Sequence, residues 1–173
     1  TEDDSVSARI DHFDLDLAGL RFPPHDLQAA LPQQLILLGA ARETAEQVYT
    51  LPGERTGVFV GMEPDPEDCC YGLRWRQSQR LRVEDLDPAQ HATWLARTCD
   101  DIIATLTPAG VVGAMPNIPA NRLNSQLDLG GASFSISKGE NSGLQSLALA
   151  ARALREGELD AALVAAVDLS CQE

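Results

Sequence analysis

The segment Asn121–Leu144 reads NRLNSQLDLGGASFSISKGENSGL, and it decides how we expect the chain to fold. Residues 133–137 predict a strand, and residues 142–156 predict a helix that begins inside the segment. Between them, Gly139 has no side chain and can close a sharp turn. The segment therefore predicts a strand, a tight turn and a helix, with Glu140 at the tip of the turn.

A second strand is expected directly after this helix. Gly157 is suited to end the helix, and residues 161–167 are apolar throughout, as is typical of a parallel strand covered on both faces. Strand, helix and strand in this order form a βαβ unit, which we expect to cross over right-handed. With an earlier helix at 33–49 and an apolar strand at 56–62, the pattern predicts an α/β chain with a mixed, largely parallel sheet.

The other helical signals are weaker. Residues 69–80 do not distinguish a helix from a loop. Asp87 and Pro88 predict a helix start, and we expect that helix to run to Leu106. A further helix is expected at 117–127. The helix at 142–156 carries on one face Leu144, Leu147, Ala148, Ala151 and Leu154.

Length and composition indicate one globular domain. The chain has 173 residues, of which 44% are hydrophobic, and we divide it into an irregular arm at 1–32 and an α/β core at 33–173. The net charge is −13, from 13 Lys and Arg against 26 Asp and Glu. Because such a surface repels phosphate, we expect neither nucleic-acid binding nor docking on anionic membranes.

The expected compartment is the cytoplasm. No apolar run reaches the roughly 18–20 residues that span a bilayer, and no secretory leader opens the sequence. The cysteines, which we expect to be reduced, are Cys69, Cys70, Cys99 and Cys171. Because the chain has no CxxC and no Cys/His spacing typical of a metal site, we expect no metal.

The expected turn would place Glu140 at the start of a helix. The free N–H groups there carry partial positive charge, worth about 0.3–1 kcal/mol to an anion at an exposed site. A carboxylate fits this field but is a poor acyl acceptor, because the product would be a reactive anhydride, whereas a Cys in that place would form a thioester. The turn can thus have the strand–turn–helix structure and still not accept an acyl group. The plainer interpretation of Glu140 is an ordinary acid in the first turn of a helix.

Five ordered blocks of the sequence resemble the β-ketoacyl synthase (condensing enzyme) family. They are Ile10–Phe13 with Leu31–Leu35, Thr56–Gly61, Asn121–Leu123 with Asp128–Leu129, Gly131–Ser133, and Leu154–Asp160. The resemblance implies a thiolase-like layered αβαβα fold, of which this chain would be part of the N-terminal half. Where the family has TACSS with its nucleophilic Cys, the chain has Lys138, Gly139, Glu140, Asn141 and Ser142, which the resemblance places at the elbow and acyl tunnel.

The resemblance also bears on the rest of the site. The family's two catalytic His residues lie in a C-terminal half that the sequence lacks, and His12, His25 and His91 match neither. The family's dimer strand, which pairs across the two-fold axis, corresponds to Ser133, Phe134, Ser135, Ile136 and Ser137. No cofactor is implied, since acyl groups would arrive on the phosphopantetheine of an acyl carrier protein.

Several functions follow from this resemblance. The first is a catalytically silent, chain-length-factor-like domain of a polyunsaturated fatty acid or polyketide synthase, paired with an active ketosynthase or a second copy, and residues 19–24 and 115–122 favour this placement. The alternatives are a decarboxylase acting on malonyl carrier protein, an ordinary 3-oxoacyl synthase relative, and an unrelated α/β domain. Whether the chain is an enzyme stays open. A carrier protein is a candidate partner, and the cationic residues it would meet are Arg74, Arg76, Arg80 and Arg82.

Overall fold

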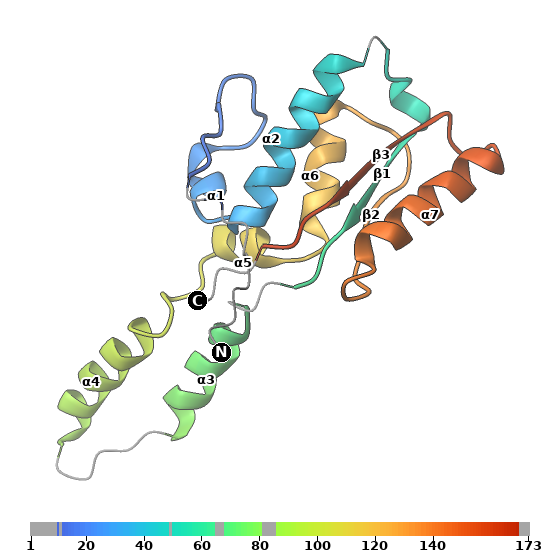
Figure 1. The fold of residues 1–173 in the computed structure, drawn as a ribbon. Coiled ribbons are helices and arrows are strands. Elements are labelled where there is room, and N and C mark those ends of the chain that lie inside the picture. The colour runs from blue at the N-terminus through green and yellow to red at the C-terminus, as the bar shows by residue number, and fades with distance from the viewer. Residues whose placement is uncertain (1–9, 11, 49, 65–67, 81–85, 170–173) are drawn as a thin grey trace, which may run out of the picture.

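A computed structural model describes residues 10, 12–48, 50–64, 68–80 and 86–169 (Figure 1). Predictions that involve Arg82, Cys171 and the first nine residues of the arm lie outside the described residues. In chain order the elements are α1 (Pro24–Gln28), α2 (Pro32–Gln47), the 3₁₀ turn η1 (Gly53–Arg55), β1 (Thr56–Gly61), α3 (Asp68–Arg80), α4 (Pro88–Asp100), α5 (Pro108–Ala114), α6 (Ile118–Leu127), β2 (Ser133–Ile136), α7 (Ser142–Arg155) and β3 (Ala161–Ala166).

The described strands form one parallel sheet in the order β2-β1-β3. Val58 of β1 pairs with Ser133 of β2 on one side and with Leu163 of β3 on the other. All six residues of β1 are buried, because this strand has neighbours at both edges and helices over both faces. The predicted strand–helix–strand order and the α/β class are confirmed, and β1 lies between the two strands that α7 connects.

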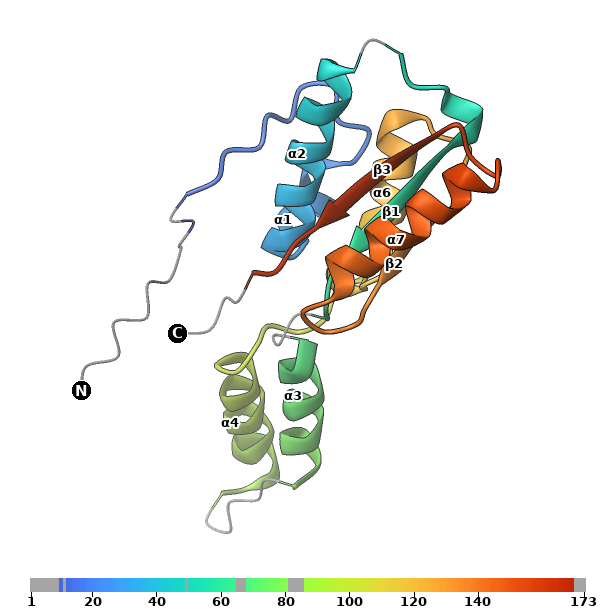
Figure 2. The ribbon, with the colours of Figure 1, turned by 45° about the vertical axis from the view of Figure 1, so that its right-hand side comes forward.

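Helices cover the two faces of the sheet in separate layers. Figures 1 and 2 show α7 against one face, with α2 and α6 together against the other. The larger core lies on the α2 and α6 side and includes Leu38, Val58, Val60 and Leu123, each at most 1% exposed. A smaller cluster beneath α7 contains Phe59, Ala150, Ala153 and Leu159. The chain is thus a partial α–β–α portion of a layered α/β domain.

The packing of α7 leaves its apolar face uncovered. The residues that α7 buries are small: Ser142, Ser146, Ala150 and Ala153. The leucines of the predicted apolar face lie outward instead, since Leu144 is 68% exposed, Leu147 is 55% exposed and Leu154 is 40% exposed. Small side chains are required on the inner face because α7 approaches the sheet very closely. The apolar face is therefore left uncovered in this chain.

The strand β3 is also less covered than its apolar sequence predicts. Five of its six residues are half-buried, and Ala166 is exposed. The reason is its place in the sheet, since β3 is an edge strand among the described strands. In this chain it is β1 that occupies the fully covered position.

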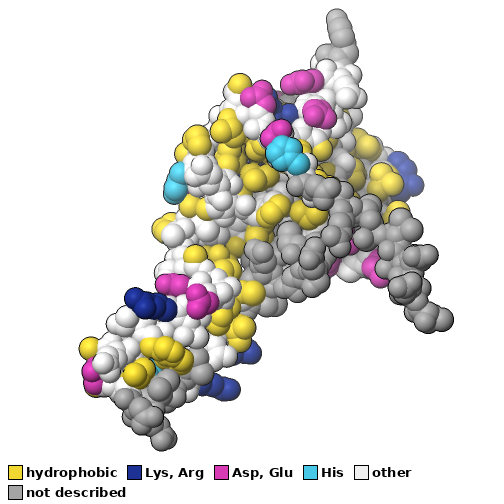
Figure 3. Space-filling view, turned by 60° about the vertical axis from the view of Figure 1, so that its left-hand side comes forward, with side chains coloured by type: hydrophobic (Ala, Val, Ile, Leu, Met, Phe, Trp, Pro, Cys, Tyr) yellow, Lys and Arg dark blue, Asp and Glu magenta, His cyan; other side chains and the backbone are white. Residues whose placement is uncertain are grey.

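The helices α3 and α4 form a hairpin that projects from the core (Figures 1 and 2). The predicted start of α4 is confirmed, because Asp87 caps it in a capping box with Gln90. The predicted end at Leu106 is wrong, since α4 stops at Asp100. Beyond that point, Arg74 of α3 donates to the carbonyl of Ile103 at 2.7 Å. The dark-blue side chains on the hairpin in Figure 3 are arginines, since neither α3 nor α4 contains a lysine.

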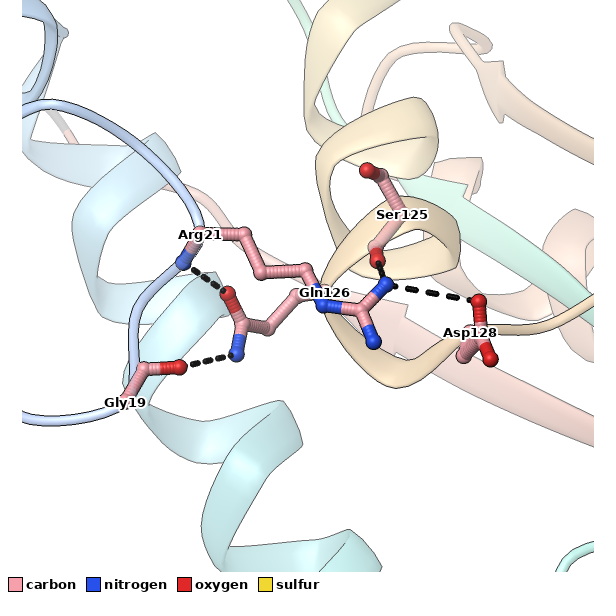
Figure 4. Close-up of polar contacts among 5 residues, drawn as sticks. All are labelled: Gly19, Arg21, Ser125, Gln126 and Asp128. Atoms are coloured by element: carbon pink, nitrogen blue, oxygen red, sulfur yellow. Dashed lines mark hydrogen bonds and ion pairs between the residues drawn. The ribbon is translucent and has the colours of Figure 1, made fainter.

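The described part of the arm is fastened to the core although it contains little regular structure. Its one described helix is the five-residue α1, which the sequence prediction of an irregular arm missed. Figure 4 shows one attachment, in which the Arg21 guanidinium donates to the carbonyl of Ser125 at 2.8 Å and contacts Asp128 at 3.3 Å. The amide side chain of Gln126 bonds the backbone of Gly19 and Arg21, each at 3.0 Å.

Candidate functional site

The turn between β2 and α7 is sharp, and Glu140 lies within it. Gly139 adopts a φ of +57°, in the left-handed region that favours glycine. The backbone N–H of Ser142, the first residue of α7, donates to the carbonyl of Gly139 at 3.0 Å. The Glu140 side chain is exposed at this corner. The structure thus places Glu140 one residue before the helix N-cap, Asn141.

The end of β1 lies directly beneath the start of α7. A Cβ atom on Gly61 would stand 2.5 Å from the backbone nitrogen of Gly143, too close for any other residue to fit without a shift. At the same edge of the sheet, Met62 donates to the carbonyl of Ile136 and Val167 donates to the carbonyl of Gly61, both at 3.0 Å. The carboxyl ends of all three strands therefore meet below the turn, which is where open parallel sheets commonly place their sites.

The carboxylate of Glu63 binds the turn from the end of β1. One oxygen accepts from the Ser137 hydroxyl at 2.6 Å, and the other accepts from the backbone N–H of Gly139 at 2.5 Å. That second oxygen also lies 2.9 Å from the hydroxyl of Ser142. The sequence analysis missed Glu63, because its partners lie 74 to 79 residues further along the chain. No local motif marks it.

These hydrogen bonds lower the pKa of Glu63 from its ordinary value. The hydroxyls of Ser137 and Ser142 contribute most, partial desolvation opposes them, and the backbone N–H groups of Gly139 and Lys138 add to the lowering. Because this pKa is lower in the folded state, the ionised Glu63 carboxylate stabilises the fold at pH values above the ordinary carboxyl pKa. That contribution is lost as the pH falls through the lowered value.

The five predicted elbow residues do not all engage in the same way. Ser142 is buried, and its hydroxyl accepts from the backbone N–H of Lys138 at 2.8 Å and lies 2.6 Å from the carbonyl of Gly139. The ammonium group of Lys138 donates to the side chain of Gln145 at 3.0 Å and so lies along α7. The structure thus brings Lys138, Gly139 and Ser142 together with Glu63, and leaves Glu140 facing solvent.

The predicted dimer strand lies at an edge of the sheet. Among the described strands, β2 pairs only with β1, so its other edge is open. Phe134 of this strand packs edge-on against Phe59, with ring centroids 5.0 Å apart, and is still 41% exposed. The hydroxyl of Ser133 donates to the side chain of Asn121 at 2.9 Å.

Thiols and metal ligands do not gather at the turn in the described part of the chain. The free thiols described there are Cys70, which is half-buried, and Cys99, which is buried, and both lie on the hairpin. Within the same residues no group of three or more His, Cys, Asp and Glu side chains could hold a metal ion. The three His residues lie apart from the turn: His12 on the arm beside Asp14, His25 on α1, and His91 on α4.

The arginines proposed for carrier-protein docking are not equivalent. The guanidinium of Arg74 is engaged in local contacts. It pairs with Asp100 at 2.6 Å and donates to the hydroxyl of Thr105 at 2.8 Å. Arg76 and Arg80 are exposed on the same helix. These two therefore carry the accessible positive charge of α3.

Comparison with known proteins decides the family. The sequence matches the family described as "Beta-ketoacyl synthase, N-terminal domain" over residues 2–173. The chain belongs to the β-ketoacyl synthase family. The resemblance in the ordered sequence blocks is thereby confirmed, and the match assigns the chain to the N-terminal part of a synthase.

The relatives of this synthase domain are far longer synthases. It is 32% identical over 161 residues to "Highly reducing polyketide synthase frbB" of Dothideomycetidae sp., and 29% identical over 163 residues to a polyunsaturated fatty acid synthase of Thraustochytrium sp.. These alignments cover 91% and 92% of the chain but only 5% and 8% of the relatives. The chain therefore spans a small part of the proteins it matches.

A solved structure confirms the fold of the synthase domain. "The ishigamide ketosynthase/chain length factor" superposes with a TM-score of 0.58 at 19% sequence identity, and the match covers 85% of this chain and 37% of that chain. At this identity the likeness shows the fold alone. It supports the partial thiolase-like fold expected from the sequence. No described helix combines the length and the apolar character needed to cross a membrane.

Proposed function

We propose that the chain is a catalytically silent ketosynthase domain that acts like a chain length factor. The observation that carries the proposal is Glu140 at the strand-to-helix turn, where the family resemblance places the nucleophilic Cys. The turn keeps the architecture of a nucleophile elbow, with Gly139 in the left-handed region. A carboxylate there is a poor acyl acceptor, so the domain would shape a site without holding an acyl group on the enzyme.

In this proposal the domain pairs with an active ketosynthase and helps to shape the acyl tunnel. The open edge of β2 supports such pairing, because a second β-strand could extend the sheet there. The exposed leucines of α7, Leu144 and Leu147, are where a further layer of the αβαβα domain would pack. An acyl carrier protein is a proposed transient partner, with Arg76 and Arg80 as its contacts. The proposal requires no cofactor, and the cytoplasm is the proposed compartment.

The main alternative is a decarboxylase that acts on malonyl carrier protein. Decarboxylation needs an oxyanion site and His donors, and it does not need a Cys nucleophile. Against it stand two carboxylates at the turn, Glu63 and Glu140, which would repel a developing enolate. An ordinary 3-oxoacyl synthase is disfavoured by the missing Cys.

The test uses the parent protein that contains this chain, supplied with malonyl carrier protein. Condensation and CO₂ release are measured for the parent and for Glu140→Cys. We expect no CO₂ release in the absence of condensation, and Glu140→Cys should give little added condensing activity unless the catalytic His pair is also present. Release of CO₂ without condensation, lost when this domain is deleted, would establish the decarboxylase instead.

A further inference from the structure

Glu63 connects two segments that lie far apart in the sequence. Its carboxylate reaches Ser137, Gly139 and Ser142, the beginning, middle and end of the turn that carries Glu140. We propose that Glu63 is the positioning residue of the elbow: it holds the turn 137–142 in shape and places a fixed negative charge at the start of α7. This role goes beyond the proposed function and does not depend on it, since the turn needs the same support whether or not the domain is silent.

The chemistry of the contacts requires a carboxylate at position 63. An ionised carboxylate only accepts, and here one oxygen accepts from the Ser137 hydroxyl while the other accepts from the Gly139 N–H. Such charge-assisted bonds are roughly twice as strong as neutral ones. A Gln at position 63 would keep the shape but would offer one accepting oxygen in place of two. A change from Glu to Gln therefore tests the charge with little change of volume.

The buried hydroxyl of Ser142 extends this support across the turn. It accepts from the backbone N–H of Lys138 at 2.8 Å, which ties the start of the turn to the start of α7. Its single proton can serve either Glu63, at 2.9 Å, or the carbonyl of Gly139, at 2.6 Å. Glu63 is thus part of a hydrogen-bond network that binds the turn at Ser137, Gly139 and Ser142.

The charge of Glu63 also bears on the chemistry that the turn can perform. The other charged side chains on the turn are Lys138, which donates to Gln145, and Glu140. The start of a helix favours a thiolate because of its partial positive charge. A carboxylate that accepts from the Gly139 N–H offsets that partial charge and would raise the pKa of a thiol on the turn. Glu63 therefore disfavours a nucleophile at position 140.

The first experiment measures hydrogen exchange by mass spectrometry in the parent protein at pH 7. We compare Glu63→Gln, Glu63→Ala and the control Glu46→Gln, which removes an exposed carboxylate from α2. We expect the peptide covering 137–142 to exchange about tenfold faster in Glu63→Ala and by a smaller factor in Glu63→Gln, with the second half of α7 and the control unchanged. Wild-type exchange in both variants would overturn the proposal. If Glu63→Ala does not fold, Glu63→Gln decides.

The second experiment separates positioning charge from general structural support. The parent protein with Glu140→Cys is compared with the double variant Glu140→Cys and Glu63→Gln, and with Glu140→Cys and Glu46→Gln. The alkylation rate of the introduced thiol is followed against pH, and peptide mapping distinguishes it from Cys69, Cys70, Cys99 and Cys171. We expect removal of the Glu63 charge to lower the thiol pKa, and Glu46→Gln to leave the thiol pKa unchanged. An equal or higher pKa in the Glu63 variant would refute the electrostatic role.

Discussion

At the scale of single residues, the site depends on a close approach between backbones. Gly61 ends β1 where a Cβ would meet the backbone of Ser142 and Gly143 at 2.5 Å. Because both neighbours are backbone atoms at the start of a helix, neither can move aside without shifting α7. A glycine at position 61 is therefore a condition for bringing Glu63 within reach of the turn.

We predict that Gly61→Ala destabilises the chain by about 1–3 kcal/mol, the usual cost of overpacking a core. The matched control is Gly72→Ala in α3, where nothing lies within 4 Å of the added Cβ. In a helix that exchange should stabilise by about 0.5–1 kcal/mol. Denaturant unfolding followed by circular dichroism gives both values. Equal stability of Gly61→Ala and the wild-type chain would contradict the described packing.

Sequence reasoning found some of these residues and could not find others. Gly139 and Glu140 were predictable because the signals for a strand, a turn and a helix are local and lie in one short segment. Glu63 was not predictable, since only the folded sheet brings the end of β1 to a turn more than 70 residues away. The close backbone approach that leaves no room for a Cβ atom at Gly61 could not be predicted, for the same reason.

At the scale of elements, α7 shows that helical periodicity identifies a helix but does not determine which of its faces is buried. The predicted helix is present, and Leu144, Leu147 and Leu154 do lie on one face. That face is exposed because close contact with β1 admits only small side chains such as Ser146 and Ala150 on the inner side. Hydrophobicity alone would favour burial of the leucine face. No local sequence pattern predicts how closely the helix packs on the sheet.

This orientation predicts opposite effects for two substitutions on α7. Leu147→Gln should change the free energy of unfolding of this chain by less than about 0.5 kcal/mol, because the side chain is 55% exposed. Ala150→Leu should cost about 1–3 kcal/mol, because Ala150 is 2% exposed beneath the helix. The measurement is denaturant unfolding of the two variants against the wild-type chain. A larger loss for Leu147→Gln would mean that α7 packs the other way around.

At the scale of the whole molecule, the chain corresponds to part of a larger fold. One face of its sheet is covered by α2 and α6, while α7 on the other face presents an apolar surface outward. The structural neighbour is more than twice as long as the matched portion, since the match covers 37% of it. The fold class was predictable because strand and helix signals alternate along the chain. The projection of the hairpin was not predictable, because it depends on the packing of α3 against α4, two helices that are separate in the sequence.

The central claim is that the elbow is intact but does not accept an acyl group. The most direct measurement incubates the parent protein with malonyl and acyl thioesters, traps any activated carboxylate with hydroxylamine, and maps the peptide that contains residue 140 by mass spectrometry. A synthase that has the family's Cys at the elbow serves as the positive control for thioester formation. Our account predicts no acyl or hydroxamate adduct at Glu140. An adduct there, absent from Glu140→Gln, would contradict it.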